Sequence, residues 1–137
     1  MTASRAIQAV LVFLLSLVLS SCSSRSASGR DTKPETVVIT YRAKSGKEAE
    51  LQATLIHSWQ IYRSEHLVFA EPHTIVRIAD DAGKFRFVET FTWVNHSIPD
   101  FASDAVTKIW AQQQSLCEAR GGYQGIEADE VELVTRK

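Results

Sequence analysis

The sequence predicts one α+β domain in which a four-stranded antiparallel sheet carries two helices on one face. Segments rich in branched and aromatic residues, typical of strands, alternate with two segments whose apolar residues recur at helical spacing. The resulting order is strand, helix, strand, strand, helix, strand, and a tight turn joins the second strand directly to the third. Residues 36–137 contain all six elements, a length that suits a single small core.

The first strand and the first helix are predicted from residue 36 onward. Residues 36–44, TVVITYRAK, have the β-branched and aromatic content of a strand. Ser45 and Glu48 match a capping box, in which the serine caps a helix and the glutamate reaches back to it. An apolar stripe follows at spacings of four, four and three, formed by Leu51, Leu55, Trp59 and Tyr62. His57 lies off this stripe, so we expect it to be exposed.

Residues 67–93 are predicted to form a hairpin of two long strands. The turn DDAGK at 80–84 suits a type I turn followed by Gly83 in the left-handed conformation. The register that follows pairs Asp80 with Lys84, Arg77 with Phe87, Ile75 with Glu89, His73 with Phe91, and Glu71 with Trp93. Pro72 cannot donate a ladder hydrogen bond, so we expect it on an edge strand or at a bulge.

One face of this hairpin is the predicted place of any chemical site. Because side chains alternate along a strand, aromatic rings and ionisable groups share this face: Glu71, His73, Ile75 and Arg77 with Phe85, Phe87, Glu89, Phe91 and Trp93. Either this face packs on the helices, or a second copy of the chain or a ligand covers it. If a face of this kind were exposed to solvent in the monomer, it would mark an interface or a ligand groove.

The last two elements follow a loop at 94–103. A helix begins at Ser103 or Asp104 and is predicted to end at Gly121-Gly122. Its apolar side carries Val106, Ile109, Trp110, Gln113, Leu116 and Cys117. Residues 130–135, EVELVT, alternate as a final strand. With right-handed crossovers the six elements form a ferredoxin-like arrangement, with the second and fourth strands at the sheet edges.

The first 21 residues have the pattern of a secretion signal. Arg5 precedes a short apolar run that is too short to span a bilayer as a stable helix. The run ends in Leu19-Ser20-Ser21-Cys22, which resembles the bacterial lipoprotein box and implies acylation of Cys22 after removal of residues 1–21. Residues 22–35 then read as the lipidated cysteine and a polar, flexible tether. The sequence therefore predicts a lipid-anchored protein of the cell envelope. Because Ser23 follows Cys22, we expect the anchor in the outer membrane if the cell has two membranes.

Charge and cysteine content exclude two classes of interaction. Loss of Arg5 with the signal leaves 14 basic and 16 acidic side chains, so nucleic acid is not an expected partner. Once Cys22 is lipidated, Cys117 is the only remaining cysteine, and no disulfide can form within the chain. We expect Cys117 to be buried as an apolar filler.

The candidate catalytic residues are His73 and Glu89. A histidine beside a carboxylate can abstract a proton, because the carboxylate orients the imidazole and stabilises its charged form. Phe91 and Trp93 would form the wall for a flat substrate, and Glu71 and His96 would border it. A structural alternative pairs Glu89 with Arg77 and leaves His73 bonded within the edge strand. A metal alternative uses Glu71, His73, Glu89 and His96, but their spacing matches no metal motif, so no metal and no cofactor are predicted.

The order and lengths of the elements, with the aromatic third strand ending in Trp93, resemble the dimeric α+β barrel superfamily of antibiotic-biosynthesis monooxygenase-like domains. The resemblance covers residues 36–135. It implies a homodimer with two sheets packed face to face, and a pocket between sheet and helices in each subunit. The haem-degrading members use an asparagine on the first strand, a tryptophan on the third and a histidine on the second helix. Trp93 matches the tryptophan, but residues 36–44 lack asparagine and residues 104–117 lack histidine.

Two functions follow from this reading. The first is a lipid-anchored, extracytoplasmic module that binds a small apolar or aromatic ligand, or a partner, without chemistry. The second is a cofactor-free, monooxygenase-like enzyme that uses His73 and Glu89 to form a substrate anion. Export argues against a reaction that needs reduced nicotinamide, because that cofactor is held inside the cell.

Overall fold

The structure of the protein, a computed structural model, describes residues 33–80 and 83–134. The predicted signal peptide at 1–21, the lipidation site Cys22 and all of the tether before Lys33 lie outside the described residues. Within the described part, neither long helix has the length and apolar content that a membrane span requires.

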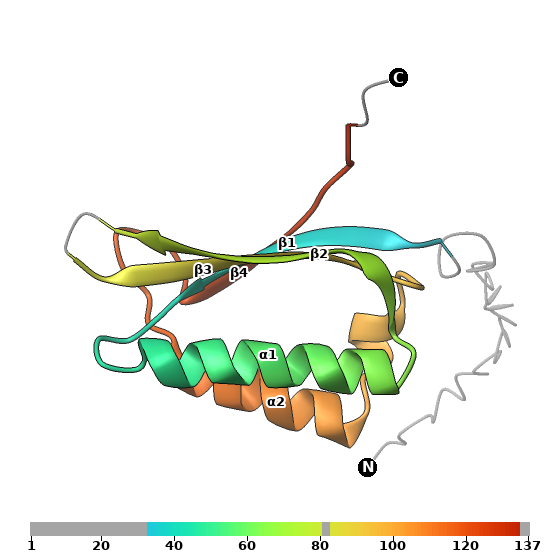
Figure 1. The fold of residues 1–137 in the computed structure, drawn as a ribbon, viewed down its shortest axis with the longest axis horizontal. Coiled ribbons are helices and arrows are strands. Elements are labelled where there is room, and N and C mark those ends of the chain that lie inside the picture. The colour runs from blue at the N-terminus through green and yellow to red at the C-terminus, as the bar shows by residue number, and fades with distance from the viewer. Residues whose placement is uncertain (1–32, 81–82, 135–137) are drawn as a thin grey trace, which may run out of the picture.

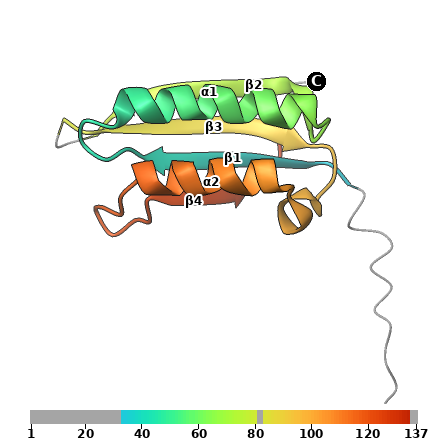
Figure 2. The same cartoon turned by 90° about the horizontal axis from the view of Figure 1, so that it is seen from below.

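Two layers make up the fold, a four-stranded sheet and a pair of helices on one of its faces (Figures 1 and 2). The elements are β1 Glu35–Arg42, α1 Glu48–Ser64, β2 Val68–Ala79, β3 Phe85–Trp93, the 3-10 helix η1 Ile98–Phe101, α2 Asp104–Leu116 and β4 Ile126–Glu130. The sheet order is β2-β3-β1-β4 and every neighbouring pair is antiparallel. This confirms the predicted ferredoxin-like α+β class, with β2 and β4 at the edges.

The hairpin register is confirmed over most of its length. The Asp80 amide donates to the Lys84 carbonyl at 2.7 Å, and Gly83 adopts the expected positive φ of 70°. From Ala79 opposite Phe85 the ladder continues to His73 opposite Phe91. Beyond that point the prediction for Glu71 is wrong, because an irregularity around Pro72 brings Val68 opposite Trp93 instead. Pro72 cannot donate a ladder bond, so the break falls on the edge strand where it is tolerated.

The predicted helix ends are only partly correct. The Ser103 hydroxyl accepts a hydrogen bond from the Val106 amide at 3.3 Å and caps α2 as expected. The capping box at Ser45 is wrong, because a turn with Gly46 at a φ of 79° places Lys47 at the start of α1. At the other end, α2 stops at Leu116 rather than at the glycine pair, because Cys117 is already extended and bridges to Ala43.

The last strand lies earlier than predicted, over Ile126–Glu130 rather than residues 130–135. Gly125 directly precedes it, and a Cβ at this position would lie 3.1 Å from the Glu118 backbone, so a side chain here would require that backbone to shift. Pairing with β1 runs from Ile126 opposite Tyr41 to Glu130 opposite Val37. After Val131 the chain leaves the sheet on the side away from the helices (Figure 1), and Val134 is 95% exposed.

The aromatic face of the hairpin packs on the helices, which decides between the two arrangements that the sequence left open. Its buried residues join those of β1 and both helices in two clusters, which include Val37, Tyr62, Phe91, Trp93, Val106 and Ile109 in one and Tyr41, Leu51, Leu55, Phe87 and Leu116 in the other. Cys117 is buried in the second cluster as expected. The opposite face of the sheet carries β-branched residues such as Val38, Val76 and Val88, and no described element covers it.

Candidate functional site

A buried carboxylate lies at the centre of the sheet. Glu89 projects from the middle of β3 toward the helices and is fully buried. Its Oε1 lies 3.1 Å from His73 Nε2, and its Oε2 accepts a hydrogen bond from the Tyr41 hydroxyl at 3.1 Å. The register explains this contact, because Tyr41 on β1 and His73 on β2 lie diagonal to Glu89 on the two strands that flank β3.

His73 is held in place by an aromatic ring as well as by the carboxylate. The indole of Trp59, from α1, stacks on the imidazole with ring centroids 3.5 Å apart and planes 6° apart. The His73 side chain is 18% exposed, so its ring still reaches the surface at the edge strand. The structural alternative required Arg77 to pair with Glu89, and the two do not pair. The Arg77 guanidinium lies 3.7 Å from the centre of the Phe85 ring instead.

The protonation of Tyr41 is fixed by its surroundings. Burial, and then the nearby Glu89 carboxylate, raise the pKa of Tyr41 well above its usual value. The phenol therefore keeps its proton at ordinary pH and donates a hydrogen bond to Glu89. A buried carboxyl group needs hydrogen-bond partners, and Glu89 has two, the Tyr41 hydroxyl and His73 Nε2.

A pocket of about 410 Å³ lies between β1, β4 and α2. Its walls are mainly apolar and aromatic, formed by Val37, Ile39, Tyr41, Trp93, Trp110 and Ile126. Polar groups gather around it and at its rim, namely Glu35, Gln113, Gln114, Asp129 and Glu130. An apolar cavity with a few polar groups is the usual form of a small-molecule site, and this volume falls in the usual range.

Gln113 is a buried polar group of this pocket whose amide nitrogen makes no hydrogen bond of good geometry to a described residue. Its side chain is 2% exposed. The adjacent Tyr62 hydroxyl already accepts a hydrogen bond from Trp110 Nε1 at 2.6 Å. Burial raises the pKa of Tyr62 to about 12, and the neighbouring Trp110, Ser58 and Gln113 side chains partly offset this; the Gln113 amide thus lies near the Tyr62 hydroxyl without forming a hydrogen bond of good geometry. A buried amide donor without an acceptor costs about 1–3 kcal/mol, so a ligand oxygen that accepted from Gln113 Nε2 would be favoured.

The site residues predicted on the hairpin fall into three places. His73 and Glu89 meet, but neither lines the pocket, and Tyr41 lies between them and it. Trp93 lines the pocket, whereas Phe91 is fully buried and does not line it. The centroids of the Phe91 and Trp93 rings are 4.8 Å apart. Glu71 is exposed at the irregular part of β2, away from the others. The roles of these residues stay predictions.

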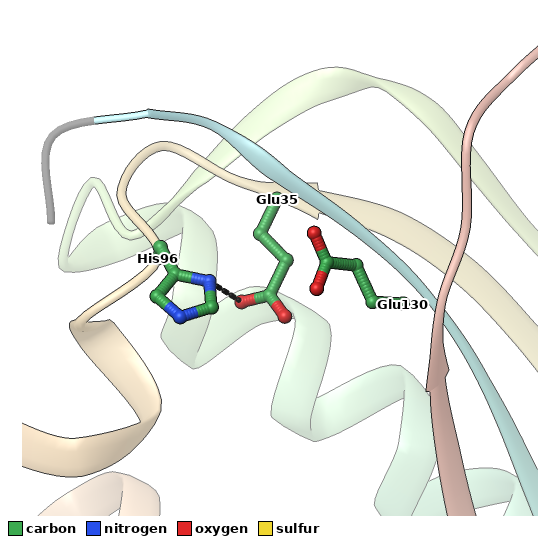
Figure 3. Close-up of side chains that lie close together, drawn as sticks. All are labelled: Glu35, His96 and Glu130. Carbon is green, nitrogen blue, oxygen red and sulfur yellow. Dashed lines mark ion pairs between the residues drawn. The ribbon is translucent and has the colours of Figure 1, made fainter. Parts of the chain in front are cut away.

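His96 lies beside Glu35 and Glu130, two carboxylates that line the pocket and were not predicted as site residues (Figure 3). Its Nδ1 forms an ion pair with Glu35 Oε2 at 3.2 Å when the imidazole is protonated. Glu130, from the end of β4, lies on the other side of Glu35. Sequence analysis also missed Tyr41 and Gln113 as site residues. The signal for Gln113 was available, since a glutamine interrupts the apolar stripe of the second helix.

Comparison with protein-family models and with curated proteins gave no match to the sequence. Among solved structures, the fold is similar to a variant of SnoaB, a cofactor-independent oxygenase from Streptomyces nogalater, with a TM-score of 0.55 and 13% identity over 76% of this chain and 96% of that one. The likeness establishes the fold. A candidate antibiotic biosynthesis monooxygenase from Deinococcus radiodurans has a TM-score of 0.51 and 18% identity over 75% and 95% of the two chains. A protein from Shewanella oneidensis has a TM-score of 0.51 and 16% identity over 74% and 91%.

Proposed function

We propose that the protein binds a flat, largely apolar small molecule that carries an acceptor oxygen, in the pocket between β1, β4 and α2. The unpaired amide donor of Gln113 is the observation that carries this proposal. The ring of such a ligand would lie against the pocket wall that Trp93 and Trp110 form with their edge-to-face indoles, and its oxygen would accept a hydrogen bond from Gln113 Nε2.

A matched pair of probes tests the proposal. The full chain in detergent is titrated with 1,4-naphthoquinone and with naphthalene, and binding is followed by quenching of tryptophan fluorescence. Both probes are flat, but only the quinone carries acceptor oxygens. Wild-type protein should bind the quinone more tightly, and Gln113→Leu should lose this preference. Equal binding of both probes by the wild type, or an unchanged preference in the variant, would refute the role of Gln113.

A second candidate function is a cofactor-free, monooxygenase-like enzyme, and the position of Tyr41 favours it. The Tyr41 ring lines the pocket, while its hydroxyl donates to Glu89, which in turn contacts His73. A bound phenol could pass a proton to the Tyr41 oxygen as Tyr41 gives its own proton to Glu89, with His73 carrying charge toward the surface. The substrate anion would remain in the pocket and could react with oxygen.

Turnover separates this function from simple binding. Tyr41→Phe removes the hydroxyl and keeps the ring, so quinone binding should persist while oxygen consumption with a phenolic substrate falls about 100-fold or more. Tyr123→Phe is the matched control, because Tyr123 is exposed and lies outside this pocket. Oxygen consumption that is equal in wild type and Tyr41→Phe would exclude the relay.

We further propose that the protein acts in the cell envelope as a homodimer anchored through Cys22. The lipoprotein-type sequence before Cys22 supports the anchor. The β-branched face of the sheet supports the homodimer, since Val76 is 48% exposed there and apolar surface of this kind usually marks an interface.

A further inference from the structure

Three segments that are distant in the sequence bring ligating side chains together at the mouth of the pocket. Glu35 is the first residue of β1, His96 follows β3, and Glu130 is the last residue of β4. They meet because β3 and β4 flank β1 in the sheet. The backbone fixes two of the positions, since the His96 amide donates to Lys33 at 2.9 Å and the Val131 amide donates to Thr36 at 2.9 Å.

The charges of this cluster are not balanced by the described protein. Its imidazole nitrogen and two carboxylate oxygens all lie within 4.8 Å of one another. The only described ion-pair partner of Glu35 is His96, and no described residue forms a hydrogen bond or an ion pair with the Glu130 side chain. Two carboxylates at this separation repel each other, and a cation between them would turn that repulsion into attraction.

The spacing and the donor types suit a divalent cation. For metal–ligand bonds of about 2.0–2.2 Å in tetrahedral geometry, neighbouring donor atoms lie roughly 3.3–3.6 Å apart. Glu35 Oε2 and His96 Nδ1 are already 3.2 Å apart. Glu130 and His96 are both exposed and can adjust. One imidazole nitrogen with two carboxylate oxygens suits ions such as Zn²⁺, Mn²⁺ or Fe²⁺. It suits soft ions, and ions that prefer oxygen ligands alone, less well.

A second observation indicates that this end of the molecule takes a ligand. Glu35 and Glu130 also line the pocket into which the side chain of Gln113 faces, and the buried Nε2 of Gln113 has no described partner. We propose that Glu35, His96 and Glu130 bind a divalent cation at the mouth of the pocket, with coordination positions left for a ligand oxygen. Three protein ligands and an open position are the form that metal sites take when the ion meets a substrate or ligand.

The test titrates the metal alone into the full chain, without a histidine tag and without an organic ligand. Co²⁺ is followed by its visible absorption, and Zn²⁺ and Mn²⁺ by calorimetry. Wild-type protein should bind one ion per chain, and Glu35→Gln, His96→Gln and Glu130→Gln should each weaken binding at least tenfold. His57→Gln and Glu132→Gln are matched controls, because both side chains are exposed and outside the cluster, and they should change nothing. Thermal unfolding by circular dichroism verifies that each variant folds.

Two results would overturn the proposal. One is the absence of stoichiometric binding by folded wild-type protein, and the other is binding that persists unchanged in Glu35→Gln and Glu130→Gln. The Gln113→Leu variant separates this inference from the proposed ligand function. It should keep its cation while it loses its preference for the quinone, whereas Glu130→Gln should lose the cation and keep the hydrogen bond from Gln113.

Discussion

Replacement of Gln113 by leucine should make the ligand-free protein more stable and its ligand binding weaker. Gln113 is 2% exposed and its Nε2 has no described partner. An unsatisfied buried donor costs about 1–3 kcal/mol, and leucine of similar size removes that cost while it stays buried. At roughly 4–8 °C per kcal/mol for a domain of this size, the midpoint of thermal unfolding should rise by at least about 4 °C.

The same change should weaken binding of an acceptor ligand by the corresponding amount. A loss of about 1–3 kcal/mol is roughly 5- to 150-fold in dissociation constant. Urea unfolding gives the change in free energy, and fluorescence titration with 1,4-naphthoquinone gives the change in affinity. Gln112→Leu is the matched control, because Gln112 is exposed on the same helix and should shift stability by no more than about 0.5 kcal/mol. A Gln113→Leu protein that is less stable than wild type would show that the amide serves the fold, and would refute the reasoning.

The remaining predictions concern Glu89, alkaline pH, the sheet face and the anchor. Glu89→Leu leaves His73 and Tyr41 without their shared acceptor, so urea unfolding should show a loss of about 1–3 kcal/mol, and a variant as stable as the wild type would contradict a structural role for this carboxyl group. Burial raises the pKa of Cys117 from 9.0 to about 11 and that of Tyr62 from 10.0 to about 12. The unfolded chain loses these protons first, so stability should fall between about pH 9 and pH 12, and Cys117→Ala should reduce the part of that fall below pH 11. Val76→Asp should halve the mass found by light scattering, and a wild-type protein that already has the mass of one chain would contradict the homodimer. Cys22→Ser should abolish acylation measured by mass spectrometry, whereas Cys117→Ser should not.

The parts of the fold that local chemistry decides could be predicted from the sequence. The turn at 80–84 has one favourable conformation, and it fixed the pairing of His73, Ile75 and Arg77 with β3. Beyond Pro72 the ladder no longer constrains the chain, and the predicted position of Glu71 was wrong for that reason. The contact of His73 with Glu89 followed from the register alone.

The pocket could not be predicted, because it depends on where β4 pairs. Residues 131–134 are more apolar than Ile126–Glu130, yet the latter segment pairs with β1. Gly125, just before this segment, lies close to the Glu118 backbone, and no local sequence pattern reveals such a contact. Because the last strand was predicted at residues 130–135, the cluster of Glu130 with Glu35 and His96 was not predicted. The pocket that Gln113 lines was not predicted either.

The central claim is that the pocket between β1, β4 and α2 holds a small molecule, and native mass spectrometry tests it most directly. The full chain is isolated from the cells that produce it, beside an Ala128→Trp variant whose indole would fill the pocket that Ala128 lines. The claim predicts that wild-type protein releases one small organic molecule per chain and that the variant releases none. A wild-type protein without such a molecule, or equal amounts from both proteins, would contradict it.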